Sequence, residues 1–489
     1  MPWIYGKKDA KTIMDRRLDG YKYFLGFNLR KILLYDSQVE SQIQEILSKE
    51  DRFSVLKISS LKALRKEFPD DSTSYESVAL ISRRRFGDGN LKTFFQERGY
   101  NDVFCYLIVS GIQNPRWFFP CEKGILRKSK NIVRPSKLRS MIIWRIAKLL
   151  SDIGLARIIF PAHIWIAHRT NENNSLTQWL QEIFRNISIK IVLYTGAPGP
   201  FQKFTAQILD GNYQVLGYVK IGSNLHTIAR IENEMNSLTS LGNYDLQNIR
   251  LPKIIEKKSP VKDTLMICTT PPPEGFSTVD HAINEVHIQA LINLFHYAPQ
   301  KVLPLQGYME NLLDEFAQVK ETSTEMNLID FEQMLHSFIS YLSIKGPNEI
   351  TLIFSHGDFI PWNIFRKQSQ LFIFDWEMAD YRVPFWDIYT FILHSNMVKH
   401  GKNKEKMWHL LTTEYVTLVG KFNAGIGKVP EINQKLYLSI FFYQTLLIYL
   451  KYHQLEKDLN FPHNDEILNI IELAHFCFSR CVSRLVTEA

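Results

Sequence analysis

The stretch Thr351–Asp387 reads TLIFSHGDFIPWNIFRKQSQLFIFDWEMADYRVPFWD, and the rest of the chain can be interpreted from it. Two short apolar runs, Thr351–Phe354 and Leu371–Phe374, have the length and composition of β-strands. A loop rich in functional groups connects them, and the second run ends in a carboxylate. The groups are His356, Asp358, Asn363 and Asp375. The stretch therefore predicts a strand–loop–strand unit that carries a site.

The spacing of these groups indicates a specific chemistry. Asp358 and Asn363 are five residues apart, and Asp375 ends the next strand, which is the arrangement of catalytic loops in phosphoryl transfer. Magnesium prefers oxygen ligands and takes one or two from side chains, so Asn363 and Asp375 are the candidate metal ligands. Asp358 is the candidate base for an attacking hydroxyl. The alternative is a hairpin whose polar loop is merely solvated, and the joint match disfavours it.

The motifs H-G-D-F-I-P-W-N and I-F-D-W-E resemble the aminoglycoside phosphotransferase and choline kinase superfamily, over about residues 188–489. The resemblance implies a protein-kinase-like fold and phosphorylation of hydroxyls on small molecules. That superfamily has D-W-E where protein kinases have D-F-G, as in Asp375–Glu377 here. It also implies that Asp387 holds the catalytic loop from a helix, and that His356 braces the loop without acting as the base.

Length and composition set bounds on the domains and on the compartment. The 489 residues suffice for two or three domains, and the net charge of +8 suits anionic ligands such as a nucleotide. The five cysteines include no C-x-x-C pair, which argues against a zinc site or a disulfide framework. The N-terminal residues lack a secretory apolar core, and no apolar run is long enough to span a bilayer. A cytoplasmic protein is expected.

We expect an α/β (α+β) fold in three parts. Residues 1–187 form an N-terminal α/β accessory domain without a recognised catalytic motif, residues 188–275 a kinase-like N-lobe, and residues 276–489 a helical C-lobe. The two lobes together give the bilobal protein-kinase-like fold. In the accessory domain the patterns predict one helix and two strands, at Gln38–Leu47, Phe53–Ile58 and Val103–Gly111.

A basic segment stands out between Cys121 and Leu150, where nine lysines and arginines accompany one acid, Glu122. The pattern predicts a helix from Ser136 to about Ile153. Its apolar stripe consists of Leu138, Met141, Ile142, Ile146, Leu149 and Ile153. A basic amphipathic helix can lie on an anionic membrane, but a helix packed on its own domain is the favoured interpretation. Nucleic-acid binding is not expected, because no binding module is recognisable.

The N-lobe is predicted from three strands, at Lys190–Gly196, Lys203–Asp210 and Val215–Gly222. The first loop, GAPGPF, contains Gly196 and Gly199, whose backbone amides can approach phosphate oxygens. Two prolines in the same loop each remove an amide donor, so it departs from the full Gly-rich pattern.

Lys220 in YVKI resembles the kinase lysine that pairs with the α- and β-phosphates. An exposed strand lysine is the alternative. The predicted helix Asn224–Leu241 follows, and Glu234 lies beside its apolar face, so we assign Glu234 as the partner of Lys220, with Glu232 second. Two further strands and the PPPEG linker then lead to the C-lobe, and backbone groups near Cys268–Thr270 are expected to meet the adenine.

The C-lobe is expected to be helical, and in the superfamily its helices hold the acceptor. The strongest helical patterns are His281–Phe295, Ile329–Leu342, Phe441–Leu455 and Glu466–Leu485. Asp380, Tyr381 and Arg382 either contact the acceptor or are simply solvated, and the sequence favours neither.

The first hypothesis is an ATP- and Mg²⁺-dependent phosphotransferase that acts on a hydroxyl of a sugar, an amino alcohol or an aminoglycoside-like molecule. The second is a non-catalytic, nucleotide-binding scaffold of the same fold, which retention of every base and metal position disfavours. The third is a Ser/Thr protein kinase, which ranks lower because no D-F-G to A-P-E segment is recognisable. The sequence does not name the acceptor or distinguish ATP from GTP.

Overall fold

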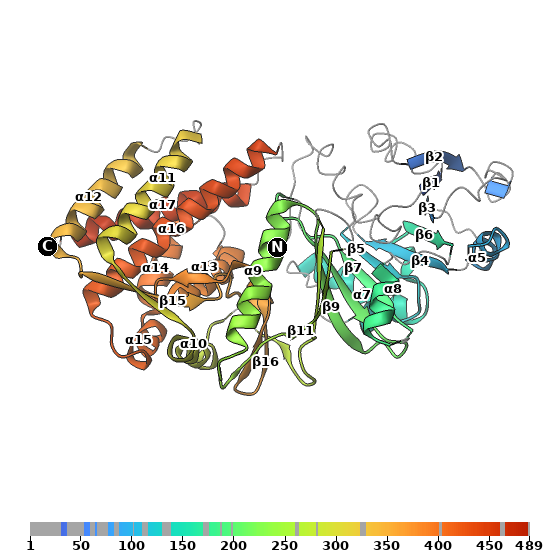
Figure 1. Ribbon diagram of the computed structural model, residues 1–489, viewed down its shortest axis with the longest axis horizontal. Coiled ribbons are helices and arrows are strands. Elements are labelled where there is room, and N and C mark those ends of the chain that lie inside the picture. Colours follow the sequence, from blue (N-terminus) through green and yellow to red (C-terminus); the bar gives the residue numbers. More distant parts are fainter. Residues whose placement is uncertain are drawn as a thin grey trace. The chain divides into compact units, whose positions relative to one another are not determined.

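The structure is a computed structural model, and it divides the chain into two compact units (Figure 1). Unit 1 contains Met1–Ile231 and Ile254–Pro271, and unit 2 contains Glu232–Lys253 and Pro272–Ala489. The structure describes residues 31–36, 53–58, 64–65, 77–82, 88–100, 102–109, 116–129, 138–169, 176–185, 188–196, 199–259, 264–279, 282–322, 329–400, 403–459 and 465–487.

Unit 1 is built on an 11-stranded sheet with the order β11-β12-β9-β8-β7-β5-β4-β6-β3-β1-β2. The bounds are β1 Lys31–Asp36, β2 Phe53–Ile58, β3 Ser77–Ser82, β4 Asp102–Val109, β5 Trp117–Pro120, β6 His163–His168, β7 Lys190–Tyr194, β8 Phe204–Leu209, β9 Val215–Gly222, β11 Ile254–Lys258 and β12 Leu265–Thr269. β1 pairs in parallel with β2 and β3, and the other pairs are antiparallel. One sheet thus contains strands from both sides of residue 188, and the predicted three-part division stays a prediction.

Helices cover both faces of this sheet. They are α5 Asp88–Glu97, α6 Ile125–Lys128, α7 Leu138–Asp152, the 3-10 turn η3 Ala156–Ile158, α8 Leu176–Ile183 and the first part of α9 Leu225–Leu241. Successive strand residues point to opposite faces: in β7, Ile191 and Leu193 pack in a cluster with Trp179 of α8. Val192 between them packs in another cluster with Trp144 of α7. The strand's near-continuous apolar sequence follows from this two-sided burial.

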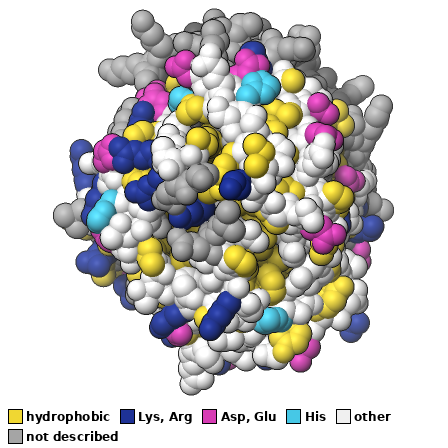
Figure 2. Space-filling view, turned by 90° about the vertical axis from the view of Figure 1, so that its left-hand side faces the viewer, with side chains coloured by type: hydrophobic (Ala, Val, Ile, Leu, Met, Phe, Trp, Pro, Cys, Tyr) yellow, Lys and Arg dark blue, Asp and Glu magenta, His cyan; other side chains and the backbone are white. Residues whose placement is uncertain are grey.

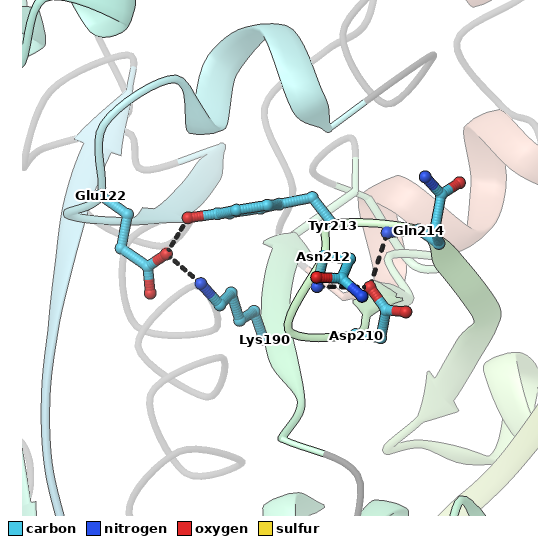
Figure 3. A network of polar contacts seen from close by, with 6 residues as sticks. All are labelled: Glu122, Lys190, Asp210, Asn212, Tyr213 and Gln214. Carbon is cyan, nitrogen blue, oxygen red and sulfur yellow. Dashed lines mark hydrogen bonds and ion pairs between the residues drawn. The ribbon is translucent and has the colours of Figure 1, made fainter.

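Polar contacts connect the segment after β5 to strand β7 and to the turn between β8 and β9 (Figure 3). Glu122 accepts hydrogen bonds from the Nζ of Lys190 and, at 2.6 Å, from the hydroxyl of Tyr213. Burial would lower the pKa of Lys190, but its hydrogen bonds to Glu122 and Tyr213 outweigh burial and raise it. In the β8–β9 turn, Asp210 Oδ1 accepts 2.8 Å bonds from the backbone N–H groups of Asn212 and Gln214.

Several predicted elements of unit 1 are confirmed. The strand at Phe53–Ile58 has the predicted bounds, and β4 and α7 fall within a residue or two of theirs. The helix predicted at Gln38–Leu47 lies outside the described residues. The helix α7 packs on unit 1, as the favoured interpretation expects, but it does so through Trp144 and Ala147. Its apolar stripe is not the packed face, because Ile142, Ile146, Leu149 and Ile153 are exposed.

Unit 2 contains two small sheets and most of the helices. The sheets have the orders β10-β17-β16-β13 and β14-β15-β18. Their strands are β10 Ile249–Arg250, β13 Ser277–Thr278, β14 Gln300–Pro304, β15 Glu349–Ser355, β16 Ile364–Lys367, β17 Gln370–Ile373 and β18 Asp380–Arg382. The helices are the second part of α9, then α10 Glu285–Tyr297, α11 Leu305–Thr322, α12 Ile329–Lys345, α13 Trp386–His400, α14 Lys404–His409, α15 Val416–Gly425, α16 Glu431–Asp458 and α17 Asp465–Thr487, with short turns η4 Pro361–Asn363, η5 Trp376–Met378 and the π-helical η6 Leu410–Glu414.

The helices of unit 2 pack through aromatic side chains. Phe331 of α12 lies 5.8 Å from Tyr443 of α16 and 5.1 Å from Phe478 of α17, measured between ring centroids. The four predicted C-lobe helices correspond to α10, α12, α16 and α17.

On the face shown in Figure 2, Lys and Arg gather at the left and Asp and Glu lie mostly at the top and right, with apolar side chains between them. Neither sign of charge covers this face.

The described residues form both helices and strands, so the predicted α/β fold class is confirmed. Among the described helices, none is both long and apolar enough to cross a bilayer.

Candidate active site

The loop between β15 and β16 contains the candidate base. Asn363, in the turn η4, donates from its Nδ2 to Asp358 Oδ2 at 2.9 Å and to the Asp358 carbonyl at 3.1 Å. Asn363 is buried, whereas Asp358 is partly exposed. The amide group of Asn363 therefore fixes the carboxylate of Asp358, and the role of Asn363 as a metal ligand stays a prediction.

Asp387 holds the start of this loop from the first turn of α13. Its Oδ2 accepts the backbone N–H of His356 at 2.9 Å, and its Oδ1 accepts that of Gly357 at 3.0 Å. Gly357 has φ +80°, and a Cβ there would lie 2.1 Å from the carbonyl oxygen of Met378. Only glycine fits this turn. The start of the loop therefore passes close to Met378, and the two carboxylate oxygens of Asp387 hold it there.

His356 is buried and both of its ring nitrogens are engaged. Nδ1 accepts the backbone N–H of Asp358 at 3.2 Å, and Nε2 lies 3.0 Å from the carbonyl oxygen of Phe374. A neutral ring with its proton on Nε2 satisfies both contacts. The ring therefore connects the loop of Asp358 to the strand end before Asp375.

The β16–β17 hairpin brings the two halves of the motif together at one end. Ile364 pairs with Ile373, and the N–H of Phe374 donates to the Asn363 carbonyl at 3.1 Å. Asp375 follows with φ 71° and ψ 50°, the left-handed region. Aspartate enters this region more readily than most non-glycine residues, and left-handed non-glycine residues are frequent at functional positions.

Three carboxylates converge beside this strand end. The oxygens of Glu234, Asp375 and Glu377 lie within 4.8 Å of one another. Glu234 is 1% exposed, whereas Glu232 on the same helix is exposed. Asn233 of the same helix donates to the carbonyls of Glu377 at 3.0 Å and Ala379 at 2.9 Å. The second part of α9 is thereby fixed to the D-W-E turn. The sequence analysis gives Glu377 no role. Its position two residues after Asp375 could have indicated that it lies near that carboxylate.

The remaining predicted residues belong to unit 1. Gly196 has φ +74°, and a Cβ there would lie 2.4 Å from the Lys203 carbonyl oxygen, so this bend also requires glycine. Gly199 lies in the same loop, between β7 and β8. Lys220 pairs with Thr205 across β8 and β9 and is 7% exposed. The alternative of an exposed strand lysine is therefore wrong, and the assignment of Glu234 as its partner stays a prediction.

Asp380, Tyr381 and Arg382 form β18, which pairs with β15. Asp380 is exposed, and its Oδ1 accepts the N–H of Tyr381 at 2.7 Å. Arg382 is 8% exposed, and its guanidinium lies 4.3 Å from the ring centroid of Trp386. Asp380 is thus open to a ligand, whereas Arg382 contributes to packing beside Asp387.

The carboxyl of Asp387 predicts a pH effect on this loop. Burial raises its pKa to about 6, against the lowering effects of the His356 and Gly357 amides and of Arg382. Because the folded-state pKa lies above the usual 3.8, protonation stabilises the fold, and this contribution is lost as the pH rises through about 6. Protonation also takes one oxygen away from an amide donor. We therefore expect turnover to fall below about pH 6. Protonation of Asp387 should not lower the melting temperature in the same pH range.

The variant Asp387→Asn should lower turnover by about tenfold to a hundredfold, because its amide places a donor against a backbone N–H and shifts the loop. Its residual activity should lack the acid limb near pH 6. Turnover and thermal melting measured across this pH range check both points, and an unchanged acid limb in the variant would assign that limb to another group.

A family model matches part of this chain. Residues 218–402 match the phosphotransferase enzyme family, APH. The resemblance read from H-G-D and D-W-E is confirmed over these residues, which include Lys220, Glu234, Asp358, Asn363 and Asp375. No curated protein sequence matches the chain significantly.

Solved phosphotransferase structures are also similar to this chain, at low identity. A thermostable mutant of aminoglycoside phosphotransferase APH(4)-Ia, in a ternary complex with ADP and hygromycin B, is 10% identical with a TM-score of 0.40 and covers 63% of this chain and 98% of its own. The GDP and kanamycin complex of APH(2")-IIia is 13% identical with a TM-score of 0.42, covering 62% and 98%. Choline kinase LicA from Streptococcus pneumoniae is 14% identical with a TM-score of 0.38, covering 64% and 99%.

Proposed function

We propose that this protein transfers the γ-phosphoryl group of ATP, with Mg²⁺, to a hydroxyl of a small molecule. The observation that carries the proposal is the Asn363–Asp358 hydrogen bond, at 2.9 Å, within a segment that matches a phosphotransferase family. A merely solvated loop does not require a buried asparagine to fix a neighbouring carboxylate.

The donor set fits magnesium. Asp375, Glu234 and Glu377 offer carboxylate oxygens within 4.8 Å of one another, and no nitrogen or sulfur ligand is among them. Hard oxygen ligands are those that Mg²⁺ takes. We assign Asp375 and the Oδ1 of Asn363 as its ligands, and Glu234 as the partner of Lys220. When bound, the metal neutralises charge on the phosphates.

The residues of the chain then have separate tasks. The carboxylate of Asp358 accepts the proton of the acceptor hydroxyl and orients its oxygen toward the phosphorus. Asn363 keeps that carboxylate in one rotamer. His356 and Asp387 hold the loop in place, and Lys220 binds phosphate oxygens from β9. Gly196 and Gly199 allow the β7–β8 backbone to approach the phosphates.

The scaffold and protein-kinase hypotheses remain the alternatives. A scaffold has no need of a base held by its own asparagine, and this disfavours the first. The second is a protein kinase, which has a long activation segment after the metal-binding aspartate. Here α13 begins soon after Glu377, and the short connection contains β18. A small-molecule acceptor is therefore the better proposal.

A turnover screen tests the proposal. The protein is incubated with Mg²⁺ and either ATP or GTP, and with a panel of sugars, amino alcohols, nucleosides and aminoglycosides. We expect release of ADP or GDP together with an acceptor that gains the mass of one phosphate. Nucleotide binding with no phosphorylated acceptor and no hydrolysis would favour the scaffold instead.

Lys220 gives a further prediction. Lys220→Met keeps the buried aliphatic stem but removes the charge, so nucleotide affinity should fall about tenfold to a hundredfold while the melting temperature changes little. Lys257→Met, at an exposed position of β11 in the same sheet, is the matched control. Equal nucleotide affinity in both variants, measured by calorimetry, would show that Lys220 does not bind phosphate.

A further inference from the structure

The helix α7 shows an apolar face to solvent. Four side chains at helical spacing form it, and their exposed fractions are large. They are Ile142 at 49%, Ile146 at 46%, Leu149 at 59% and Ile153 at 62%. Leu155 and Ile158, just after the helix, are exposed as well. Single exposed apolar residues are ordinary, whereas a contiguous set marks an interaction site.

This face cannot turn inward, because the opposite side of α7 is already packed. Trp144 and Ala147 belong to the core beneath the helix, together with Phe119 of β5 and Val192 of β7. With about 3.6 residues per turn, Trp144 and Ala147 lie roughly across the helix from Ile142 and Ile146. The outer face of α7 is therefore an apolar ridge, and the packed face of the helix holds it on the sheet.

Basic side chains border the ridge. On the same helical geometry, Arg139 lies on one flank and Arg145 on the other, and both are exposed. Asp152, the one acid of α7, forms an ion pair with Arg127. Glu122, in the segment before α6, is bound by Lys190 and Tyr213. The two acidic residues nearest to the ridge in sequence, Asp152 and Glu122, are thus each paired with a basic side chain. The arginines that border the ridge keep their positive charge.

We propose that α7 binds the surface of an anionic lipid bilayer, with its apolar ridge among the acyl chains and Arg139 and Arg145 at the headgroups. Interfacial helices have this division into an apolar face and basic flanks, and they lie in the plane of the membrane. The inference is independent of the proposed transfer reaction, because the residues that carry it lie on α7 and outside the candidate active site.

The composition of the ridge favours lipid over a protein partner. Its exposed members are isoleucine and leucine, without the tyrosine or tryptophan that protein interfaces favour at their centres. A convex ridge suits insertion between lipids, and its two arginines meet the negative surface potential of an anionic leaflet.

Vesicle co-sedimentation of the full chain tests this. The vesicles contain phosphatidylcholine with or without phosphatidylglycerol, at low and at high salt. We expect binding that needs the anionic lipid and weakens with salt. The double variant Ile146→Ser with Leu149→Ser should lower the partition coefficient about tenfold or more. Arg139→Glu and Arg145→Glu should each lower it about fivefold or more.

Matched controls lie on α12, far from α7 in sequence. Ile344 is 78% exposed and Lys345 is exposed beside it. Ile344→Ser and Lys345→Glu should leave binding unchanged, and all variants should keep the wild-type melting temperature. Equal binding to neutral vesicles, or equal losses in the controls, would overturn the proposal.

Two other outcomes would overturn it by revealing another occupant. If the ridge variants turn a dimer into a monomer in light scattering and no vesicle binding occurs, a second copy covers the ridge. If they lower the melting temperature of a protein that does not bind vesicles, another segment of the same chain covers it.

Discussion

Asp358→Asn is expected to abolish most phosphoryl transfer while MgATP still binds. The substitution keeps the volume of the side chain but removes the proposed base, and general base catalysis contributes about 10²–10⁴-fold. The asparagine at position 358 still has a side-chain oxygen that can accept the hydrogen bond from Asn363, so the loop should keep its shape. Turnover with the best acceptor and nucleotide affinity are measured on the same preparation.

The matched control is Asp314→Asn, which removes a carboxylate from an exposed position of α11. It should behave as the wild type. A variant of Asp358 that turns over as fast as the wild type would show that this carboxylate is not the base.

Asp375→Asn should fail differently, because it removes a negative charge from the proposed metal site. We expect Mg²⁺-dependent nucleotide affinity and turnover to fall together, each by at least about a hundredfold, since the phosphate charge is no longer neutralised. Affinity for the nucleotide in the absence of metal should change little. Calorimetric titrations with and without Mg²⁺ separate the two contributions.

The glutamates of α9 provide an internal comparison for the carboxylate cluster. Glu234→Gln alters the buried member of the cluster, whereas Glu232→Gln alters an exposed neighbour on the same helix. The first should lower turnover and the second should not. Equal effects of the two substitutions would show that the cluster of Glu234, Asp375 and Glu377 has no special role.

Local patterns were sufficient to predict much of the structure. Each strand from β7 to β9 has a short apolar run bounded by glycine or a turn, and α9 begins one residue after its cap, Asn224, whose Oδ1 accepts the Thr227 N–H at 2.9 Å. The spacing of Asp358 and Asn363 indicated their relation because a five-residue loop brings both to one strand end. Asp358 and Asn363 are close in sequence and their side chains are also in contact.

Long-range pairing was not predictable in the same way. β16 was read as part of the loop, because its four residues IFRK show no clear alternation, and its pairing with β17 defines it. The strand β14 was missed for the same reason. The cysteines appeared scattered, yet pairing of β4 with β5 places the Sγ atoms of Cys105 and Cys121 2.8 Å apart.

The face on which α7 packs was not predictable, for a different reason. The apolar stripe through Ile142, Ile146 and Leu149 has the regular spacing of a buried face, whereas the buried set is Trp144 and Ala147. Periodicity measures how apolar residues are arranged around a helix, and it does not state whether protein or another apolar medium covers them. Which face packs depends on the strands beneath, which the helix sequence does not contain.

The transfer of label from γ-³²P-ATP tests the central claim most directly. Wild type and Asp358→Asn are compared at saturating MgATP with each acceptor of the panel, and the labelled products are separated. We predict label in the hydroxyl of one small molecule with the wild type, and at least about a hundredfold less with the variant. No labelled acceptor with a wild type that binds MgATP, or equal labelling by the two proteins, would contradict the account.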